Sequence, residues 1–422
     1  MTDRLDLLIV GAGPAGMAAA VAASAAGRRV TILDDNPAPG GQIWRGFSTA
    51  AAGTYPGAKP LVALHRSLRD HTVDIRSRTR VISTPAPRTL RVQDDGGAAD
   101  YSYQDLILAT GARERFLPFP GWTLPGVLGA GGLQALVKSG LSVRDKRVVV
   151  AGSGPLLPAV AATLARHGAR IQGIFEQAPL DRLARFAFTL AAHPGKILEG
   201  LRYRVTTLSA PYRTSSWIVS AHGAEHLESV DVCIGDTSRR LACDYLACGF
   251  HLVPNLELPL LLGCTISDNC VAVDANQQSS LPHVYCAGEV TGIGGLEKAL
   301  CEGEIAALSS AGKSAAHLFE RRDRLARFAR RLDVTFAPRR ELAQLATPDT
   351  LVCRCEDVPR GALETCHSWR EAKLHTRCGM GPCQGRVCGP ATNFLFGWQQ
   401  ESVRPPLAPA RVATLAAPPP SQ

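Results

Sequence analysis

The chain has 422 residues, of which 45% are apolar, so it is long enough for about three domains with cores of their own. Its formal net charge is +9 at pH 7, and eight arginines against two aspartates gather between residues 321 and 340. Only two aromatic residues interrupt that basic segment, which lacks the pattern of a recognised nucleic-acid-binding fold. We therefore expect no nucleic-acid partner.

The first elements along the chain form a strand, a glycine loop, a helix and a second strand. We expect the strands at 7–10 and 30–33 and the helix at 14–26. In such a loop the glycines permit a tight turn and close approach of the backbone to a pyrophosphate, and the helix N-terminus favours the anion. An acid at the end of the second strand would accept hydrogen bonds from a ribose. The candidate residues are Gly11, Gly13, Pro14, Ala15, Gly16 and Asp34, with Asp35 as a rival acid.

A second unit of this kind follows about 140 residues later, with strands expected at 148–151 and 171–175 and a helix at 155–167. Two such units predict an α/β protein with two nucleotide-binding folds on parallel sheets. The second loop has Leu157 in place of the third glycine, which should crowd the helix against the strand or displace the loop. Gly152, Gly154 and Glu176 are the candidate ligands, and the sequence leaves open whether this fold binds NAD(P), ATP or nothing.

Two later strands and one Gly-Gly segment carry a family resemblance. One strand ends in Ala-Thr-Gly at 109–111, the other ends in Gly-Glu at 288–289, and Gly-Gly-Gln lies at 40–42. Together with the first loop, these segments resemble the two-dinucleotide-domain flavoproteins of the glutathione reductase and thioredoxin reductase types over about residues 5–310. The resemblance implies bound FAD, with Glu289 at a ribityl hydroxyl. The further FAD residues that it implies are Gly41, Gln42, Thr110, Gly111 and Gly288.

Cysteine is absent before Cys233, and six of the thirteen cysteines lie between residues 353 and 388. Crowding of this kind in a chain without an apparent export signal indicates a metal site rather than disulfides. Four thiolates from two short loops can hold a [2Fe–2S] cluster or Zn²⁺, and the Cys-x-x-Cys knuckles usual for zinc do not occur. The absence of such a pair also argues against thiol–disulfide exchange.

The segment around these cysteines resembles the [2Fe–2S] domain of the bacterioferritin-associated-ferredoxin type. The resemblance rests on Cys-Arg-Cys-Glu at 353–356 and Gly-Met-Gly-Pro-Cys-Gln-Gly at 379–385. It implies that Cys378 is a spare thiol. The ligands that it implies are Cys353, Cys355, Cys383 and Cys388.

These segments predict a division of the chain into five parts. Residues 1–115 and 245–311 would form the FAD domain, and 116–244 a second, NAD(P)-binding-like domain. An Arg-rich bridge at 312–350 would lead to the [2Fe–2S] domain at 351–400, followed by a Pro/Ala-rich tail at 401–422.

The order of these modules resembles the FAD-containing subunit of multisubunit dye-linked amino-acid and opine dehydrogenases. This group includes opine oxidases, D-hydroxyproline dehydrogenase, hydrogen cyanide synthase and archaeal-type proline dehydrogenases. The resemblance implies an electron-transfer subunit in a hetero-oligomer. Its partners would be a D-amino-acid-oxidase-like FAD subunit that oxidises a C–N bond and a small ferredoxin-like subunit.

Two other functions compete with this interpretation. The second glycine loop could serve a self-sufficient NAD(P)H-dependent reductase that passes electrons through the cluster. Alternatively, a zinc-bound C-terminus could belong to a scaffold subunit. No apolar run of 18 residues occurs, and the N-terminus lacks a signal-peptide pattern. We therefore expect a cytoplasmic protein without a transmembrane segment, with peripheral membrane contact only through its electron acceptor.

Overall fold

The computed structural model describes residues 4–45, 58–70, 73–190, 194–400 and 402–418. The chain forms two compact units, and each is discontinuous in the sequence. Unit 1 comprises Met1–Arg113, Val253–Arg330 and Glu401–Gln422. Unit 2 comprises Glu114–Leu252 and Arg331–Gln400, so it contains both the second glycine loop and the cysteine cluster.

Unit 1 is built on a seven-stranded sheet in the order β3-β2-β1-β6-β5-β4, with β19 paired to β6. Parallel pairing joins β1 to β2 and β6, as expected for buried apolar strands of a nucleotide-binding fold. Strands β4 and β5 instead extend β6 as an antiparallel meander. The strands are β1 (Leu5–Val10), β2 (Val30–Leu33), β3 (Val73–Arg76), β4 (Arg80–Ala86), β5 (Thr89–Gln93), β6 (Ala98–Leu108) and β19 (Val284–Cys286).

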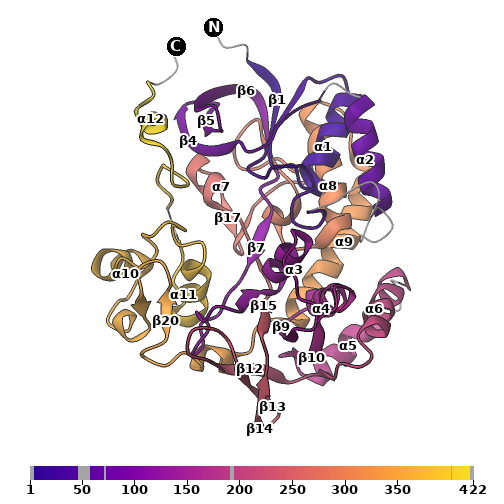
Figure 1. Cartoon of the computed structure of the whole chain (residues 1–422). Coiled ribbons are helices and arrows are strands. Elements are labelled where there is room, and N and C mark those ends of the chain that lie inside the picture. The colour runs from indigo at the N-terminus through magenta and orange to yellow at the C-terminus, as the bar shows by residue number, and fades with distance from the viewer. Residues whose placement is uncertain (1–3, 46–57, 71–72, 191–193, 401, 419–422) are drawn as a thin grey trace. The chain divides into compact units, whose positions relative to one another are not determined.

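Two helices, α1 (Pro14–Ala25) and α8 (Gly295–Ser310), lie side by side against this sheet (Figure 1). They approach closely because their contact residues are small: a Cβ on Gly303 would lie 2.2 Å from the carbonyl oxygen of Ala15. Helix α2 (Ala58–Asp70) joins α1 in the same apolar cluster, which Trp44 completes. The alanine-rich sequence of α1 therefore serves close packing on both the sheet and α8.

The C-terminal tail belongs to unit 1. Leu407 N donates to the carbonyl of Ile82 at 2.8 Å, and a short helix, α12 (Val412–Ala416), follows. Arg91 donates to the carbonyl of Ala417 at 2.5 Å and pairs with Asp100 at 2.8 Å. The described part of the tail is thus held on β4 and β5, and residues 419–422 lie outside the described residues.

Unit 1 also contains elements outside this sheet. They are α7 (Glu257–Leu262), β17 (Ile266–Ser267), β18 (Cys270–Val271) and most of α9 (Ala316–Thr335). Most of the Arg-rich segment is therefore a helix, and the division between the units falls within it, after Arg330.

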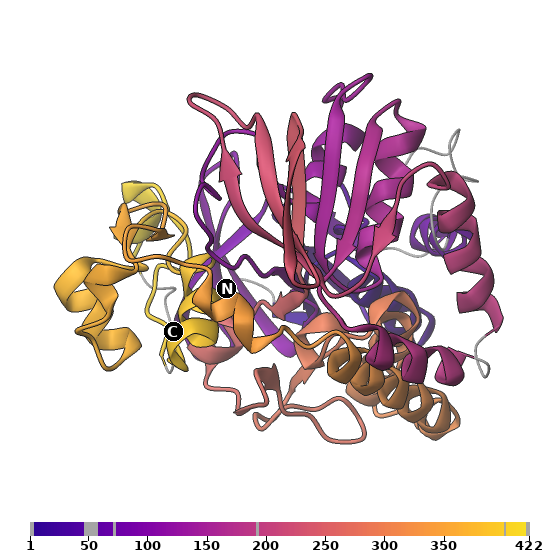
Figure 2. The ribbon, with the colours of Figure 1, turned by 90° about the horizontal axis from the view of Figure 1, so that it is seen from below.

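Unit 2 contains a second sheet in the order β11-β10-β9-β15-β8, in which all pairs are parallel. An antiparallel group, β12 to β14, lies beside it, as Figure 2 shows. The strands are β8 (Val127–Gly129), β9 (Arg147–Ser153), β10 (Arg170–Glu176), β11 (Tyr212–Arg213), β12 (Ser216–His222), β13 (Ser229–Ile234), β14 (Thr237–Ala242) and β15 (Tyr245–Phe250). The helices are α3 (Ala130–Lys138), α4 (Leu156–Arg166), α5 (Leu180–Leu190) and α6 (Pro194–Thr206). The short strands β7 (Ala112–Glu114) and β16 (Leu252–Pro254) mark the change from one unit to the other.

The cysteine cluster sits in a small module of unit 2 with its own apolar core. Its core includes Val352, Leu363, Trp369 and Ala391, all buried. The module consists of β20 (Leu351–Cys353), β21 (Val358–Pro359), α10 (Trp369–Thr376) and α11 (Cys388–Phe396). Trp122 joins it to the rest of unit 2, because its indole Nε1 donates to the carbonyl of Leu351 at 2.6 Å.

The structure confirms the two expected strand–loop–helix–strand units and the α/β fold class. In the described ranges, no helix has the length and apolar character that crossing a bilayer requires.

Candidate cofactor and metal sites

The first glycine loop has the geometry of a dinucleotide-binding turn. Gly11 has φ +106°, and a Cβ there would lie 2.2 Å from the carbonyl oxygen of Ala109. A Cβ on Gly16 would lie 1.8 Å from the carbonyl oxygen of Gly11, so the helix can pack on the strand only with glycine at this position. Pro14 opens α1, where its missing N–H costs nothing, and Ala15 follows it, buried.

The structure separates the two rival acids. Asp34 is buried, and its carboxylate accepts from Ala12 N at 2.5 Å and from Asn36 N at 2.7 Å, so it lies directly against the loop. The Asp35 side chain is 56% exposed and faces Arg80 at 3.8 Å. The acid that belongs to the glycine loop is therefore Asp34.

The Gly-Gly-Gln segment at 40–42 packs against the first glycine loop. Gly40 N donates to the carbonyl of Ala12 at 2.8 Å, and a Cβ on Gly41 would lie 3.0 Å from the Cα of Gly13. Gln42 follows in the turn with its side chain exposed. Two segments about 30 residues apart are thus in backbone contact, and only small residues permit it.

Thr110 and Gly111 are held by a residue that the sequence analysis did not identify. Asn255 Nδ2 donates to the carbonyl of Thr110 at 2.8 Å, Asn255 N donates to the carbonyl of Gly111 at 3.0 Å, and Thr110 Oγ1 donates to the Asn255 carbonyl at 3.0 Å. No sequence motif marks Asn255, because its role depends on a contact across 145 residues of chain.

Glu289 lies in a 3-10 turn between β19 and α8, and its carboxylate accepts from Gly294 N at 3.0 Å and from Gly295 N at 2.9 Å. It therefore satisfies backbone donors at the N-terminus of α8. Burial raises the pKa of this carboxyl above its ordinary value, which the two backbone hydrogen bonds oppose.

A buried ion pair that the sequence analysis also missed supports this turn. Lys298 and Glu302 pair at 2.8 Å with side chains 6% and 4% exposed. Glu302 accepts from Gly288 N at 3.0 Å and from Thr291 Oγ1 at 2.7 Å. The spacing of four residues on one helix was the available signal, but it did not reveal that the pair is buried.

The second glycine loop differs from the first in where its strand ends. Strand β9 continues through Gly152 to Ser153, whereas β1 ends before its first loop glycine, and Leu157 is fully buried in α4. The Glu176 carboxylate is fully buried and accepts from Gly154 N at 2.7 Å and from Ala178 N at 2.8 Å. Burial raises the pKa of Glu176 to about 7, which its backbone hydrogen bonds partly oppose.

A segment of the same chain lies on the carboxyl edge of this second sheet. Ser153 Oγ donates to the carbonyl of Phe336 at 2.7 Å, and Gln177 Nε2 donates to Ser153 Oγ at 2.9 Å and to the carbonyl of Ala337 at 3.3 Å. Arg339 N donates to Gln177 Oε1 at 3.0 Å. Ligands of open α/β folds bind at this edge.

Phe336 is itself buried and makes an edge-to-face contact with Phe186, with the two ring centroids 5.7 Å apart. Gln177 is fully buried and Ser153 is 4% exposed, so the hydrogen bonds to residues 336–339 are shielded from water. Residues 336–339 thereby cover the Ser153 end of the second glycine loop, whereas Pro155 in the same loop is exposed.

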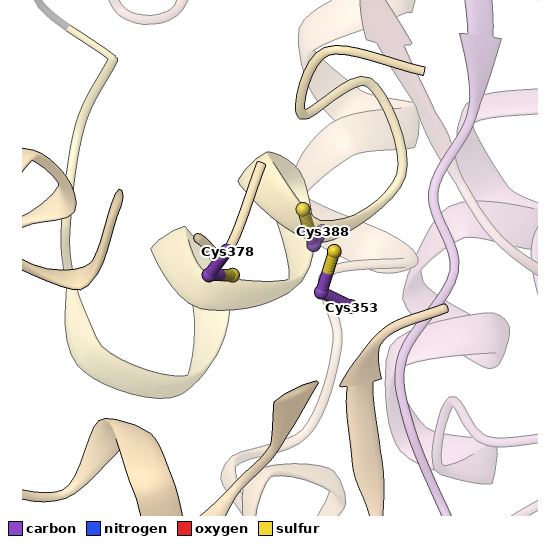
Figure 3. Close-up of side chains that lie close together, drawn as sticks. All are labelled: Cys353, Cys378 and Cys388. Atoms are coloured by element: carbon purple, nitrogen blue, oxygen red, sulfur yellow. The ribbon is translucent and has the colours of Figure 1, made fainter. Parts of the chain in front are cut away.

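The five cysteines around the predicted cluster form two groups. The Sγ atoms of Cys353, Cys378 and Cys388 all lie within 4.8 Å of one another, from the end of β20, the turn after α10 and the start of α11 (Figure 3). The thiols of Cys355 and Cys383 contact each other, and the Cys383 N–H donates to Cys355. The four predicted ligands are thus divided between both groups, with Cys378 beside two of them.

Backbone donors and neighbouring thiols favour the thiolate form of Cys353. The thiols of Cys378 and Cys388, followed by the N–H groups of Gly379 and Glu356, hold its pKa far below the ordinary range. The potential ligands are all thiols, backbone N–H groups point at sulfur, and Cys388 begins a helix. These features fit an anionic metal–thiolate centre. The glycine-rich loop is needed for this arrangement, because a Cβ on Gly381 would lie 2.3 Å from the Cβ of Cys355.

The fold and these sites define a class of flavin-type oxidoreductases, and the sequence comparison agrees. The profile of the pyridine nucleotide-disulphide oxidoreductase family matches residues 5–315, and the chain belongs to this family. Hydrogen cyanide synthase subunit HcnB of Pseudomonas aeruginosa is 34% identical to the chain, and the alignment covers 91% of each. An opine oxidase subunit of Agrobacterium tumefaciens is 31% identical over 99% of this chain and 92% of that protein.

Solved structures agree on the fold. L-Proline dehydrogenase from P. horikoshii superimposes with a TM-score of 0.71 at 17% identity, covering 98% of this chain and 80% of that one. Thioredoxin reductase from T. acidophilum gives a TM-score of 0.56 at 20% identity, covering 73% of this chain and 98% of that one. The expected thioredoxin reductase-like fold and the resemblance to subunits of opine oxidase and hydrogen cyanide synthase are therefore confirmed.

Proposed function

We propose that the chain is the FAD- and [2Fe–2S]-carrying electron-transfer subunit of a hetero-oligomeric dehydrogenase that oxidises the C–N bond of an amino acid or opine. The observation that carries the proposal is a five-thiol module in a chain that is similar, over nearly its whole length, to subunits of such oxidases. Flavin chemistry accepts two electrons together and releases them singly, as an iron–sulfur centre requires.

The residues of unit 1 would bind and orient FAD. The backbone of Gly11–Gly16 would hold the pyrophosphate, Asp34 would accept from a ribose hydroxyl, and Glu289 would face the ribityl chain. Asn255 and the Lys298–Glu302 pair would position the Thr110–Gly111 and Gly288–Thr291 segments.

The cysteine module would hold the cluster through Cys353, Cys355, Cys383 and Cys388. One iron would take the Cys355–Cys383 pair, and the other would take Cys353 and Cys388, because a [2Fe–2S] cluster binds two thiolates at each iron. Small residues around these thiols leave backbone N–H groups free to donate to sulfur.

The cover over the second glycine loop favours a relay over an NAD(P)H-dependent reductase. Residues 336–339 hydrogen-bond to Ser153 and Gln177 at the edge where a nicotinamide nucleotide would bind, which supports entry of electrons from a partner subunit instead. A substrate-oxidising flavoprotein subunit and a small ferredoxin-like subunit are the partners that we propose. The chain would contact a membrane only through its terminal electron acceptor.

The test uses the complex purified with its native partner subunits. We expect flavin and about two irons per chain, flavin reduction on anaerobic addition of the amine substrate, and none with NADH. A chain that contains zinc without iron would support the scaffold function, and rapid reduction by NADH without partners would support the reductase. Either result would contradict the relay.

A further inference from the structure

The cysteine module contains one thiol more than a [2Fe–2S] cluster needs. Five thiols lie in the two groups, whereas the cluster takes four thiolates. The excess lies entirely in one group: Cys355 and Cys383 form a pair, and Cys353, Cys378 and Cys388 form a trio. The pair matches the two positions of one iron, and the trio offers three thiols for the two positions of the other.

Any two thiols of the trio are spaced to bind one metal ion. A tetrahedral ion with metal–sulfur bonds of about 2.3 Å keeps its thiolate sulfurs about 3.8 Å apart. The three sulfurs lie within 4.8 Å of one another, so small side-chain rotations would bring any two to this spacing. Each thiol comes from a different segment, so the loss of one does not remove the others (Figure 3).

Cys378 is fixed in place rather than free to turn away. It is fully buried, and Cys378 N donates to Thr376 Oγ1 at 3.2 Å. The residues on either side, Arg377 and Gly379, have φ +63° and +81°, and a Cβ on Gly379 would lie 2.5 Å from the Trp369 indole. Burial, this hydrogen bond and the packing of Gly379 on Trp369 hold the Cys378 sulfur beside Cys353 and Cys388.

We infer that Cys378 is a reserve ligand for the iron held by Cys353 and Cys388, able to replace either thiolate when it is lost. The inference rests on the proposed [2Fe–2S] function. In the exchange, the bond from iron to the Cys353 or Cys388 sulfur would break and that thiolate would take up a proton, while the Cys378 thiol would give up its proton and bind the same iron. The iron keeps its charge, and no electron is transferred. The iron held by Cys355 and Cys383 has no such reserve among the described residues.

The reserve ligand predicts an asymmetry among serine variants of the full-length chain. Cys388→Ser and Cys353→Ser should each retain at least half of the wild-type iron and sulfide, with a changed visible circular dichroism and EPR spectrum. Cys355→Ser and Cys383→Ser should lose more than ~90% of the iron, because no third thiol lies on that side. The double variant Cys378→Ser/Cys388→Ser should lose as much.

Two single variants serve as controls. Cys378→Ser should keep wild-type iron, because both primary ligands remain. Cys366→Ser alters a buried cysteine of the same core that belongs to neither group, and it should keep both iron and spectrum. Flavin content and far-UV circular dichroism check the folding of every variant.

The outcomes separate this inference from the proposed function. If wild type binds iron but Cys353→Ser and Cys388→Ser lose it as completely as Cys383→Ser, the reserve role is wrong and the relay stands. If the double variant keeps the cluster of Cys388→Ser, the reserve role is also wrong. Wild-type protein without iron would refute the cluster, and this inference with it.

Discussion

The Ser153 hydroxyl donates a 2.7 Å hydrogen bond to the carbonyl of Phe336, a residue 183 positions further along the chain. Gln177, the residue directly after β10, strengthens this contact by donating to Ser153 Oγ at 2.9 Å. These hydrogen bonds hold the segment that leads to the cysteine module on the edge of the second nucleotide-binding fold.

Removing the Gln177 amide should loosen this cover. Gln177→Ala deletes the donors to Ser153 and Ala337 and the acceptor for Arg339 N. Loss of these buried hydrogen bonds should cost about 1–3 kcal/mol of local stability. Hydrogen exchange of the peptide spanning 333–341 should accelerate. Gln134→Ala, which removes a single half-buried bond to Thr163, is the control, and equal exchange in both variants would argue against the cover.

The close approach of α1 to its strand gives a prediction about two helical glycines. Gly→Ala normally stabilises a helix interior by about 1 kcal/mol. Gly16→Ala should instead destabilise unit 1 and lower its flavin content, since the new Cβ would lie 1.8 Å from the Gly11 carbonyl oxygen. Gly200→Ala in α6 meets no atom within 4 Å and should be neutral or stabilising. Thermal unfolding and flavin absorbance measure both, and equal effects would contradict the packing argument.

Glu176 should make stability depend on pH. Its folded pKa, about 7, lies above the ordinary value of 4.5 because the carboxyl is buried. Its stabilising contribution is therefore complete below pH 4.5 and decreases as pH rises through 7, by up to ~3 kcal/mol. Glu176→Gln should remove this decline. We expect the difference in unfolding temperature between the variant and wild type to shift in favour of the variant from pH 5 to pH 8. A constant difference would refute the raised pKa.

The buried Lys298–Glu302 pair should be sensitive to the loss of one partner. Glu302→Leu leaves the Lys298 ammonium buried without its carboxylate and also removes the acceptor for Gly288 N, which should cost about 3–5 kcal/mol. Lys298→Met/Glu302→Leu should recover part of this loss, because no uncompensated charge remains. Chemical unfolding gives the free energies, and a double variant less stable than Glu302→Leu would contradict the argument.

Much of unit 1 was predictable because its signals are local. The strands at β1 and β2, the helix α1 and the glycine loop follow from apolar runs, small residues and spacing within 30 residues. Leu157 is likewise a local signal that the second loop departs from the fingerprint, since leucine cannot occupy the place that Gly16 takes against a carbonyl.

The sequence alone determined the fold class, the two glycine loops and a set of clustered thiols, because each is encoded by side chains close together along the chain. Tertiary structure decided what spacing cannot encode: that Asn255 holds Thr110, that residues 336–339 cover the second loop, and that Cys378 lies beside Cys353 and Cys388. These contacts join residues 10 to 183 positions apart, and only the folding of separate segments onto one another brings them together.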